Sequence, residues 1–236
     1  MDENLSIAIL LLFQLYGALT LANDRELMPN RIQIPNELSA LKPENLTSRD
    51  RLRWRETLQW SEECEKGVSH YGDDFVGLHF YPLPNQKYLV RVTCSLGAYQ
   101  GSQIFFLIDE KSGKSPAQLL SFEQIFEIEP ESTDNLSDLS LKKEMNSPFR
   151  RFIDSFMWGT ITVAHNHFQM TNLNRYRGSG GCGTQTRYDI GQIPPKIIEF
   201  RAKIECTTEN IAPDKWQSYS LEQLAQWKIG TNPLRK

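Results

Sequence analysis

The stretch from Lys87 to Asp109, KYLVRVTCSLGAYQGSQIFFLID, constrains the fold of this chain more than any other part of the sequence. From Tyr88 to Cys94, apolar residues alternate with mixed ones, which is the period of a β-strand with one buried face. Residues 103–109 are apolar on both faces, which is typical of a strand covered on both sides and predicts a central place in a sheet. Gly97 and Gly101 flank the connection, where glycine adopts left-handed backbone angles without a steric penalty. The stretch therefore predicts a β-hairpin around which the rest of the domain is built.

Tyr99 and Gln100 lie between these two glycines, at the tip of the predicted hairpin. Their side chains can bond to nearby backbone groups, or they can contact a ligand. Both interpretations stay open at the level of sequence, so Tyr99 and Gln100 are candidate binding residues.

Composition and charge exclude several classes of protein. The chain has 236 residues, of which 39% are hydrophobic and 11% aromatic, and this is enough for a real core rather than a disordered chain. The formal net charge is −3, and residues 1–22 contribute two acidic and no basic residues, so the remainder carries 27 acidic and 26 basic residues, or −1. Nucleic-acid binding depends on a strong positive charge that releases counterions, so we expect no nucleic-acid partner.

An apolar segment precedes the domain. Only Ser6, Gln14 and Thr20 interrupt the run LSIAILLLFQLYGALTLA over residues 5–22, and its small residues near Ala22 suit cleavage before Asn23. These features predict that residues 1–22 are a signal peptide. The acidic residues at positions 2 and 3 stand where a signal peptide usually carries positive charge, so an uncleaved N-terminal anchor is the alternative. We therefore expect a periplasmic or secreted protein that contacts a membrane only through this segment.

The cysteine count agrees with export. An even number of cysteines behind an export signal favours disulfides, and the chain has four, at Cys64, Cys94, Cys182 and Cys206. Three pairings are possible, and we favour Cys64–Cys94 with Cys182–Cys206 because each joins neighbours along the chain. A zinc site is the competing interpretation, but such sites usually show close-spaced ligand pairs, which this sequence lacks.

The rest of the sequence predicts one domain behind a leader. Residues 23–46 are polar with three prolines and indicate a linker, and residues 47–236 indicate a single exported domain. Thr47 and Asp50 have the spacing of a capping box, which predicts a helix to about Lys66. Several alternating apolar runs predict strands, residues 214–229 predict short C-terminal helices, and residues 129–146 predict an acidic loop. The expected fold class is α+β: a mainly antiparallel β-sheet with an N-terminal helix and short C-terminal helices, stapled by two disulfides.

A second glycine loop surrounds the third cysteine, in the run RYRGSGGCG over residues 175–183. Exposed backbone N–H groups beside Arg175 and Arg177 suit an anion, whereas the alternative is a turn held only by its disulfide. If the two glycine loops meet at one end of a sheet, then Tyr99, Gln100, Arg177 and Asp189 converge on a binding cleft.

Four motifs together resemble a family of exported bacterial proteins that is catalogued only as a domain of unknown function. They are Trp60-x-x-x-Cys-Glu65, Cys94-Ser-Leu-Gly-Ala-Tyr-Gln-Gly-Ser102, Arg177-Gly-Ser-Gly-Gly-Cys-Gly183 and Phe200-Arg-Ala-Lys203 before Cys206. The resemblance covers roughly residues 54–216 and implies export and the four-cysteine framework, but no activity. The family more often carries Asp just before the third cysteine, where this chain has Gly181, and this difference weakens the case for a carboxylate site in the loop.

Two functions follow as hypotheses. The first is a non-catalytic binding or interaction module of the cell envelope, whose partner is a protein or a glycan and whose binding residues are Tyr99, Gln100, Arg175 and Arg177. The second is a metal-dependent envelope hydrolase that uses His165 and His167, because two-residue spacing on one continuous strand places both imidazoles on the same side. No catalytic residue, metal ligand set or cofactor is assigned.

Overall fold

The computed structural model describes residues 32–33, 46–72, 75–98, 100–109, 116–127, 149–164, 167–176, 181–207, 209, 211–227 and 229–230. The chain divides into a unit of residues 1–30, outside the described residues, and a unit from Arg31 to Lys236 that contains all of them. The predicted signal peptide, most of the predicted linker and the predicted acidic loop at 129–146 therefore lie outside the described residues. In the ranges given above, no helix is long and apolar enough to cross a membrane.

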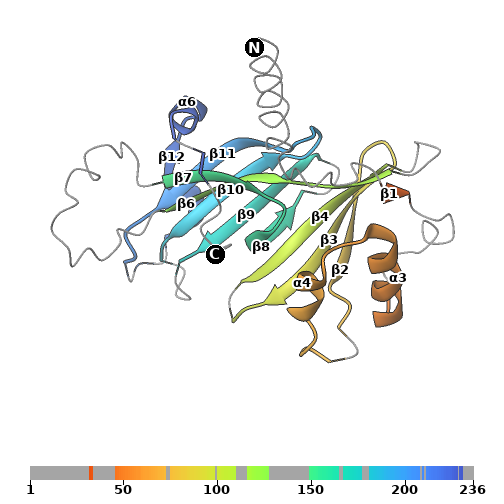
Figure 1. Cartoon of the computed structure of the whole chain (residues 1–236). Coiled ribbons are helices and arrows are strands. Elements are labelled where there is room, and N and C mark those ends of the chain that lie inside the picture. The colour runs from red at the N-terminus through yellow and green to blue at the C-terminus, as the bar shows by residue number, and fades with distance from the viewer. Residues whose placement is uncertain are drawn as a thin grey trace, which may run out of the picture. The chain divides into compact units, whose positions relative to one another are not determined.

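The predicted fold class is confirmed: the second unit is mainly antiparallel β-sheet with a few short helices. The strands are β1 (Ile32–Gln33), β2 (Leu78–Leu83), β3 (Lys87–Leu96), β4 (Gly101–Asp109), β5 (Pro116–Leu119), β6 (Phe122–Glu127), β7 (Phe149–Asp154), β8 (Met157–Val163), β9 (Gln169–Arg175), β10 (Gly183–Asp189), β11 (Lys196–Lys203) and β12 (Gln217–Tyr219). The helices are α3 (Ser48–Leu58), α4 (Glu62–Lys66), α6 (Leu221–Ala225) and the 3-10 turn η3 (Pro213–Lys215). Ten of these strands form one sheet, and β6 and β7 pair with each other (Figure 1).

Strand β4 is central to the large sheet, as its two apolar faces predict. One of its edges pairs with β3 along its length, and the other edge pairs with β8 near Gly101 and with β5 near Ile108. Beyond β8 the order continues through β9, β10, β11 and β12. On the other side, β5 pairs with β1, which falls within the range predicted to be a linker.

Both faces of β4 are buried because two hydrophobic clusters meet across it. Ile104, Phe106 and Ile108 belong to the cluster beneath α3 and α4. Phe105 and Leu107 belong to a second cluster, which β8, β9 and β10 complete. Figure 1 shows the two helices against the β2–β4 part of the sheet. Alternation in the sequence therefore assigns each residue of β4 to one of two cores.

The N-terminal helix begins where the sequence predicts, but it breaks early. Thr47 and Asp50 form the capping box, with the Thr47 backbone N–H donating to the Asp50 carboxylate at 2.7 Å. Gln59 then adopts a left-handed conformation and ends α3, and Ser61 caps the start of α4. One predicted helix is thus two, because the turn at Gln59 lets Trp60 and Cys64 reach the same core as Trp54.

A third cluster forms around Phe149 and Phe200, where α6 packs on β7 and β11. The register between β10 and β11 shifts at Tyr188, which pairs with Ile197, and Ile197 packs against both the second and the third cluster. The C-terminal segment is only partly helical, since Gln217–Tyr219 extends the sheet as β12. Residues 217–219 gain backbone hydrogen bonds by pairing with the edge strand β11. The apolar pattern of the C-terminal segment does not by itself reveal this pairing.

Both predicted disulfides are present. Cys64 pairs with Cys94, and Cys182 pairs with Cys206, with Cα atoms 4.2 Å and 4.7 Å apart. The first joins α4 to β3 in the core, and the second joins the start of β10 to the segment after β11. All four thiols are used, which removes the zinc interpretation.

Candidate functional site

The two glycine loops meet, and Gln100 joins them. The Gln100 side-chain amide donates to the backbone carbonyl of Arg175, and its oxygen accepts from the Arg175 N–H at 3.0 Å. A glutamine side chain carries the same donor and acceptor as a peptide group. Gln100 therefore bonds Arg175, the last residue of β9, as the backbone of a neighbouring strand would. In the strand order, β8 lies between β4 and β9.

Strand β8 pairs with two different strands along its length, and this explains why Arg175 is bonded by Gln100 rather than by β8. Residues Met157–Gly159 pair with β4, and Thr160–Val163 pair with β9. Gly159 has φ +134°, and a Cβ there would lie 2.0 Å from the Asn172 side-chain oxygen. Only glycine fits both the backbone angle and the close approach. The pairing between β8 and β9 stops at Thr160 and Leu173, which leaves Arg175 without a partner on β8, and Gln100 supplies one.

Three exposed aromatic and aliphatic side chains lie on segments that adjoin this junction. The Tyr71 hydroxyl donates to the Leu96 carbonyl and accepts from the Leu96 N–H at 3.2 Å. Trp158 lies opposite Ser102, whose hydroxyl is 2.7 Å from that of Ser95. Tyr71, Leu96 and Trp158 are 39%, 45% and 39% exposed. Leu96 lies opposite Gly101 and Trp158 opposite Ser102, so these two side chains project from opposite faces of the sheet at the same end of the hairpin.

The structure describes two of the four predicted binding residues. Tyr99 and Arg177 lie outside the described residues. Gln100 and Arg175 come together as described, with the Gln100 amide engaged on backbone. Asp189 lies at the opposite end of β10 from Gly183, where it accepts from the N–H of Gly191. The expected convergence of Asp189 with the loops is therefore wrong, because an extended strand separates them.

The histidines do not form a described cluster. Strand β8 ends at Val163 and β9 begins at Gln169, so His167 lies in a connection, with its N–H bonded to the Ala164 carbonyl. The continuous strand on which the metal hypothesis depended is absent, and His165 lies outside the described residues. Across the described ranges, no group of three or more His, Cys, Asp or Glu side chains is arranged to hold a metal ion.

His79 has an altered environment of its own. It lies opposite Arg91 on neighbouring strands, and Arg91 stacks over the Tyr81 ring at 5.6 Å. Burial, and then the positive charge of Arg91, lower the pKa of His79. Both causes favour the neutral imidazole in the folded protein.

The Trp60-x-x-x-Cys-Glu65 motif has a structural role. Arg51, which is 4% exposed, bonds the Glu65 carboxylate through Nη2 at 2.6 Å and Nε at 3.4 Å. The Trp60 indole N–H donates to the same carboxylate at 2.6 Å, and Cys64 holds β3. Arg51 also donates to backbone carbonyls of β3 and of the segment before β2. The motif therefore fixes α3 and α4 on the sheet.

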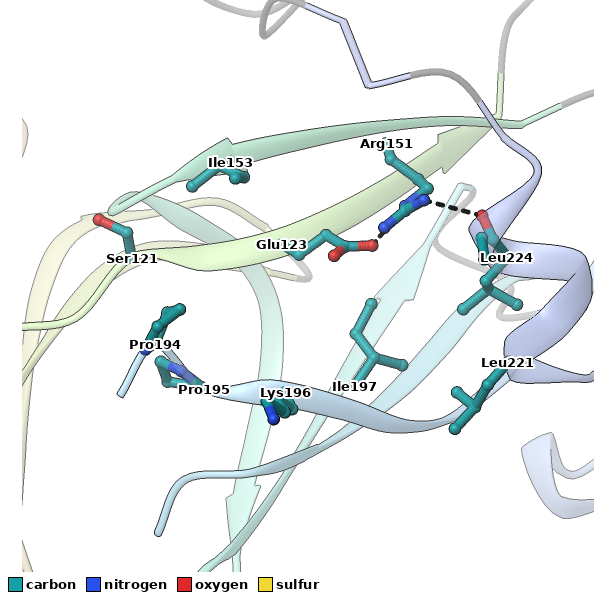
Figure 2. A pocket seen from close by; sticks show the side chains of 11 residues that line it. Ser121, Glu123, Arg151, Ile153, Pro194, Pro195, Lys196, Ile197, Leu221 and Leu224 are labelled. Carbon is teal, nitrogen blue, oxygen red and sulfur yellow. Dashed lines mark hydrogen bonds and ion pairs between the residues drawn. The ribbon is translucent and has the colours of Figure 1, made fainter. Parts of the chain in front are cut away.

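A pocket of about 290 Å³ lies between β6, β7, the start of β11 and α6 (Figure 2). Its polar base is an ion pair, in which Arg151 Nε is 2.5 Å from Glu123 Oε1 and Arg151 Nη1 donates to the Leu224 carbonyl at 3.0 Å. Exposed Ile153 and Leu221 form part of its wall. The arrangement fastens α6 to the small sheet, and its charges satisfy each other.

Sequence reasoning missed Leu96 and Trp158 as surface residues. An alternating pattern places Trp158 on the outer face of β8, but it does not show that the face is open. The pocket residues are equally invisible in the sequence, because they come from three separate segments. No protein-family model, curated protein or solved structure matches the chain.

Proposed function

We propose that the domain is a non-catalytic binding module exported to the cell envelope, and that the surface around its two glycine loops contacts the partner. We call this the loop surface and define it by Tyr71, Leu96, Gln100, Trp158 and Arg175. The observation that carries the proposal is the pair of hydrogen bonds between Gln100 and the Arg175 backbone. A rigid surface binds with a smaller loss of conformational freedom than a mobile one.

Two further features support this function. Two disulfides are typical of proteins that fold in an oxidising compartment. The motif residues Trp60, Cys64 and Glu65 are occupied by contacts within the fold, whereas Tyr71, Leu96 and Trp158 of the loop surface are exposed.

Site-specific photocrosslinking tests the proposal. A photoreactive amino acid replaces Leu96 or Trp158 in the full chain, and cells are irradiated before the envelope is isolated. We expect a discrete adduct from both positions. The matched control is Leu52, an aliphatic residue of α3 that is 55% exposed away from the loops. Adducts of equal yield at Leu52, or none at the loop surface, contradict the proposal.

The metal-dependent hydrolase with His165 and His167 is the alternative from the sequence. Elemental analysis of the purified exported protein separates the two functions. Stoichiometric zinc or another transition metal that disappears in the His167→Gln variant would favour the hydrolase.

A further inference from the structure

Strands β8–β11 present one face of the sheet to the outside, next to the loop surface. The strand register aligns the side chains of this face in rows that cross the strands. One row contains Thr162, Thr171, Arg187 and Glu199; the next contains Thr160, Leu173, Gln185 and Arg201; the third contains Arg175, Gly183 and Lys203. Trp158 precedes Thr160 by two residues and so lies on the same face. We call this set the outer face.

The outer face is positively charged, although the whole chain is acidic. Its four cations are Arg175, Arg187, Arg201 and Lys203, and its one carboxylate is Glu199, which gives +3 for these rows. Glu199 is shared between two cations, at 2.8 Å from Arg187 and 2.6 Å from Arg201. Beyond these rows, Asp189 adds a second carboxylate to the same face of β10, where it accepts from the Gly191 N–H and the Gln192 side chain. Glu205 and Glu209 follow the end of β11, and the Glu209 backbone carbonyl accepts from Lys203 Nζ at 3.4 Å. The strands therefore present an excess of positive charge.

The third row brings two cations to either side of a buried glycine. Gly183 has no side chain and stands between Arg175 and Lys203 in the register. Adjacent strands are about 4.8 Å apart, so the two cationic residues are about 10 Å apart across the glycine. Lys203 Nζ donates to the Thr207 hydroxyl at 2.7 Å, which holds its ammonium near the second glycine loop. The half-buried Arg175 and Lys203 could each meet a carboxylate or sulfate of one extended ligand.

The remaining side chains of the outer face favour a sugar over a protein surface. Protein contact sites have an apolar centre with several aromatic or aliphatic residues. Here Trp158 is the large exposed apolar side chain, Thr160 follows it on the same face of β8, and Gln185 lies two strands away from Thr160 in the same row. An indole face offers a flat apolar surface on which the C–H face of a sugar ring can stack, while hydroxyl and amide groups bond its hydroxyls.

We propose that the outer face binds an anionic glycan, a chain of sugars that carry carboxylates or sulfates. This rests on the proposed binding function and names the chemical class of its partner. The sugar ring stacks on Trp158, and the anionic groups lie along Arg175 and Lys203, since the Arg201 guanidinium is bonded to Glu199 and to the Asp214 carbonyl.

Binding of polygalacturonate to the purified full chain tests the proposal, with dextran as the uncharged polymer. We expect polygalacturonate to bind and dextran not to bind. Binding should weaken as salt rises, because exposed charges are screened within about 10 Å at 0.1 M ionic strength. The Arg175→Glu, Lys203→Glu double variant should lose at least about tenfold in affinity, since several exposed charge pairs are reversed. Trp158→Leu should lose several-fold, and Trp158→Phe should restore most of it.

The matched control is the Arg49→Glu, Arg53→Glu double variant, which makes the same charge change at two exposed positions of α3. It should bind as the wild type does. Equal loss in both double variants would show that only net charge matters and would overturn the proposal. Equal binding of poly-L-glutamate with the same dependence on Arg175 and Lys203 would also overturn it, because an acidic protein would then fit as well. Crosslinks at Leu96 to a protein, without polygalacturonate binding, would leave the binding function standing and remove the glycan.

Discussion

Arg51 shows how much of this chain depends on single buried contacts. Its guanidinium bonds Glu65 and two backbone carbonyls, and it lies 5.4 Å from the Trp60 ring centre. A buried arginine that loses its carboxylate keeps the cost of desolvation without the compensating attraction. The contacts of Arg51 therefore stabilise the fold, and the motif around Glu65 is explained by these structural contacts.

The Glu65→Gln variant should lower the free energy of unfolding by about 3 kcal/mol, because it leaves Arg51 buried without its counter-charge. Urea denaturation measures the change. Glu62→Gln is the control in the same helix, since the Glu62–Lys66 pair is 70% and 75% exposed, and it should cost less than about 1 kcal/mol. Equal costs for the two substitutions would show that the Arg51–Glu65 pair is not the stabilising contact.

His79 should make stability depend on pH. Its pKa is lowered in the folded protein, so the unfolded chain binds the proton more readily. Its contribution to stability is complete above the ordinary histidine pKa of about 6.5 and falls as the pH drops through that value. Urea denaturation at about pH 7.5 and about pH 5.5 should show a smaller loss in His79→Gln than in the wild type. The same loss in both proteins would contradict the assignment.

At the scale of elements, one side chain completes the sheet. The Arg175 end of β9 has backbone groups that β8 does not pair, and the Gln100 amide bonds both of them. Removing a partner from a partly buried polar group costs about 1–3 kcal/mol. Among the described residues, the Gln100 amide therefore makes the side-chain connection between the glycine loops, whereas the strands on either side are held by backbone ladders.

Gln100→Ala should speed amide hydrogen exchange at Arg175, because the N–H loses its acceptor. Gln100→Glu should keep that protection, since a carboxylate still accepts, yet it should lower stability by roughly 1–2 kcal/mol because it cannot donate to the carbonyl. Exchange read by NMR and denaturation by urea separate the two effects. Unchanged exchange in Gln100→Ala would mean that another group bonds the amide.

For the whole molecule, the two disulfides hold different regions with different accessibility. Cys64 and Cys94 are 0% and 2% exposed inside the first cluster, whereas Cys206 is only half-buried. Exchange requires a thiolate to reach a sulfur atom. The Cys182–Cys206 bridge should therefore be reduced first.

Mild reduction followed by alkylation and peptide mass spectrometry checks this order. We expect labelled Cys182 and Cys206 well before labelled Cys64 and Cys94. Loss of both bridges at one rate, in protein that stays folded by circular dichroism, would contradict it. Replacing Cys64 and Cys94 together by alanine should cost about 2–5 kcal/mol, as for other small disulfide-bonded domains.

The sequence by itself determined the elements whose signals are local. The β3–β4 hairpin follows from alternation, the start of α3 follows from the capping box, and the disulfide pairs join neighbours along the chain. Each depends on residues close in sequence, so propensity and spacing carry the information. The helix break at Gln59 and the strand at Gln217–Tyr219 were not predicted from the sequence, because packing against distant segments outweighed the local helix preference.

Only the tertiary structure decided how the candidate site is assembled. Gln100 and Arg175 are 75 residues apart, and the rows of the outer face come from four strands whose register no single segment contains. The sequence named both residues, yet it also placed Asp189 with them, and the length of β10 keeps that carboxylate at the far end. A side chain's chemistry can be read from its own position, but its neighbours are set by strand pairing across the whole chain.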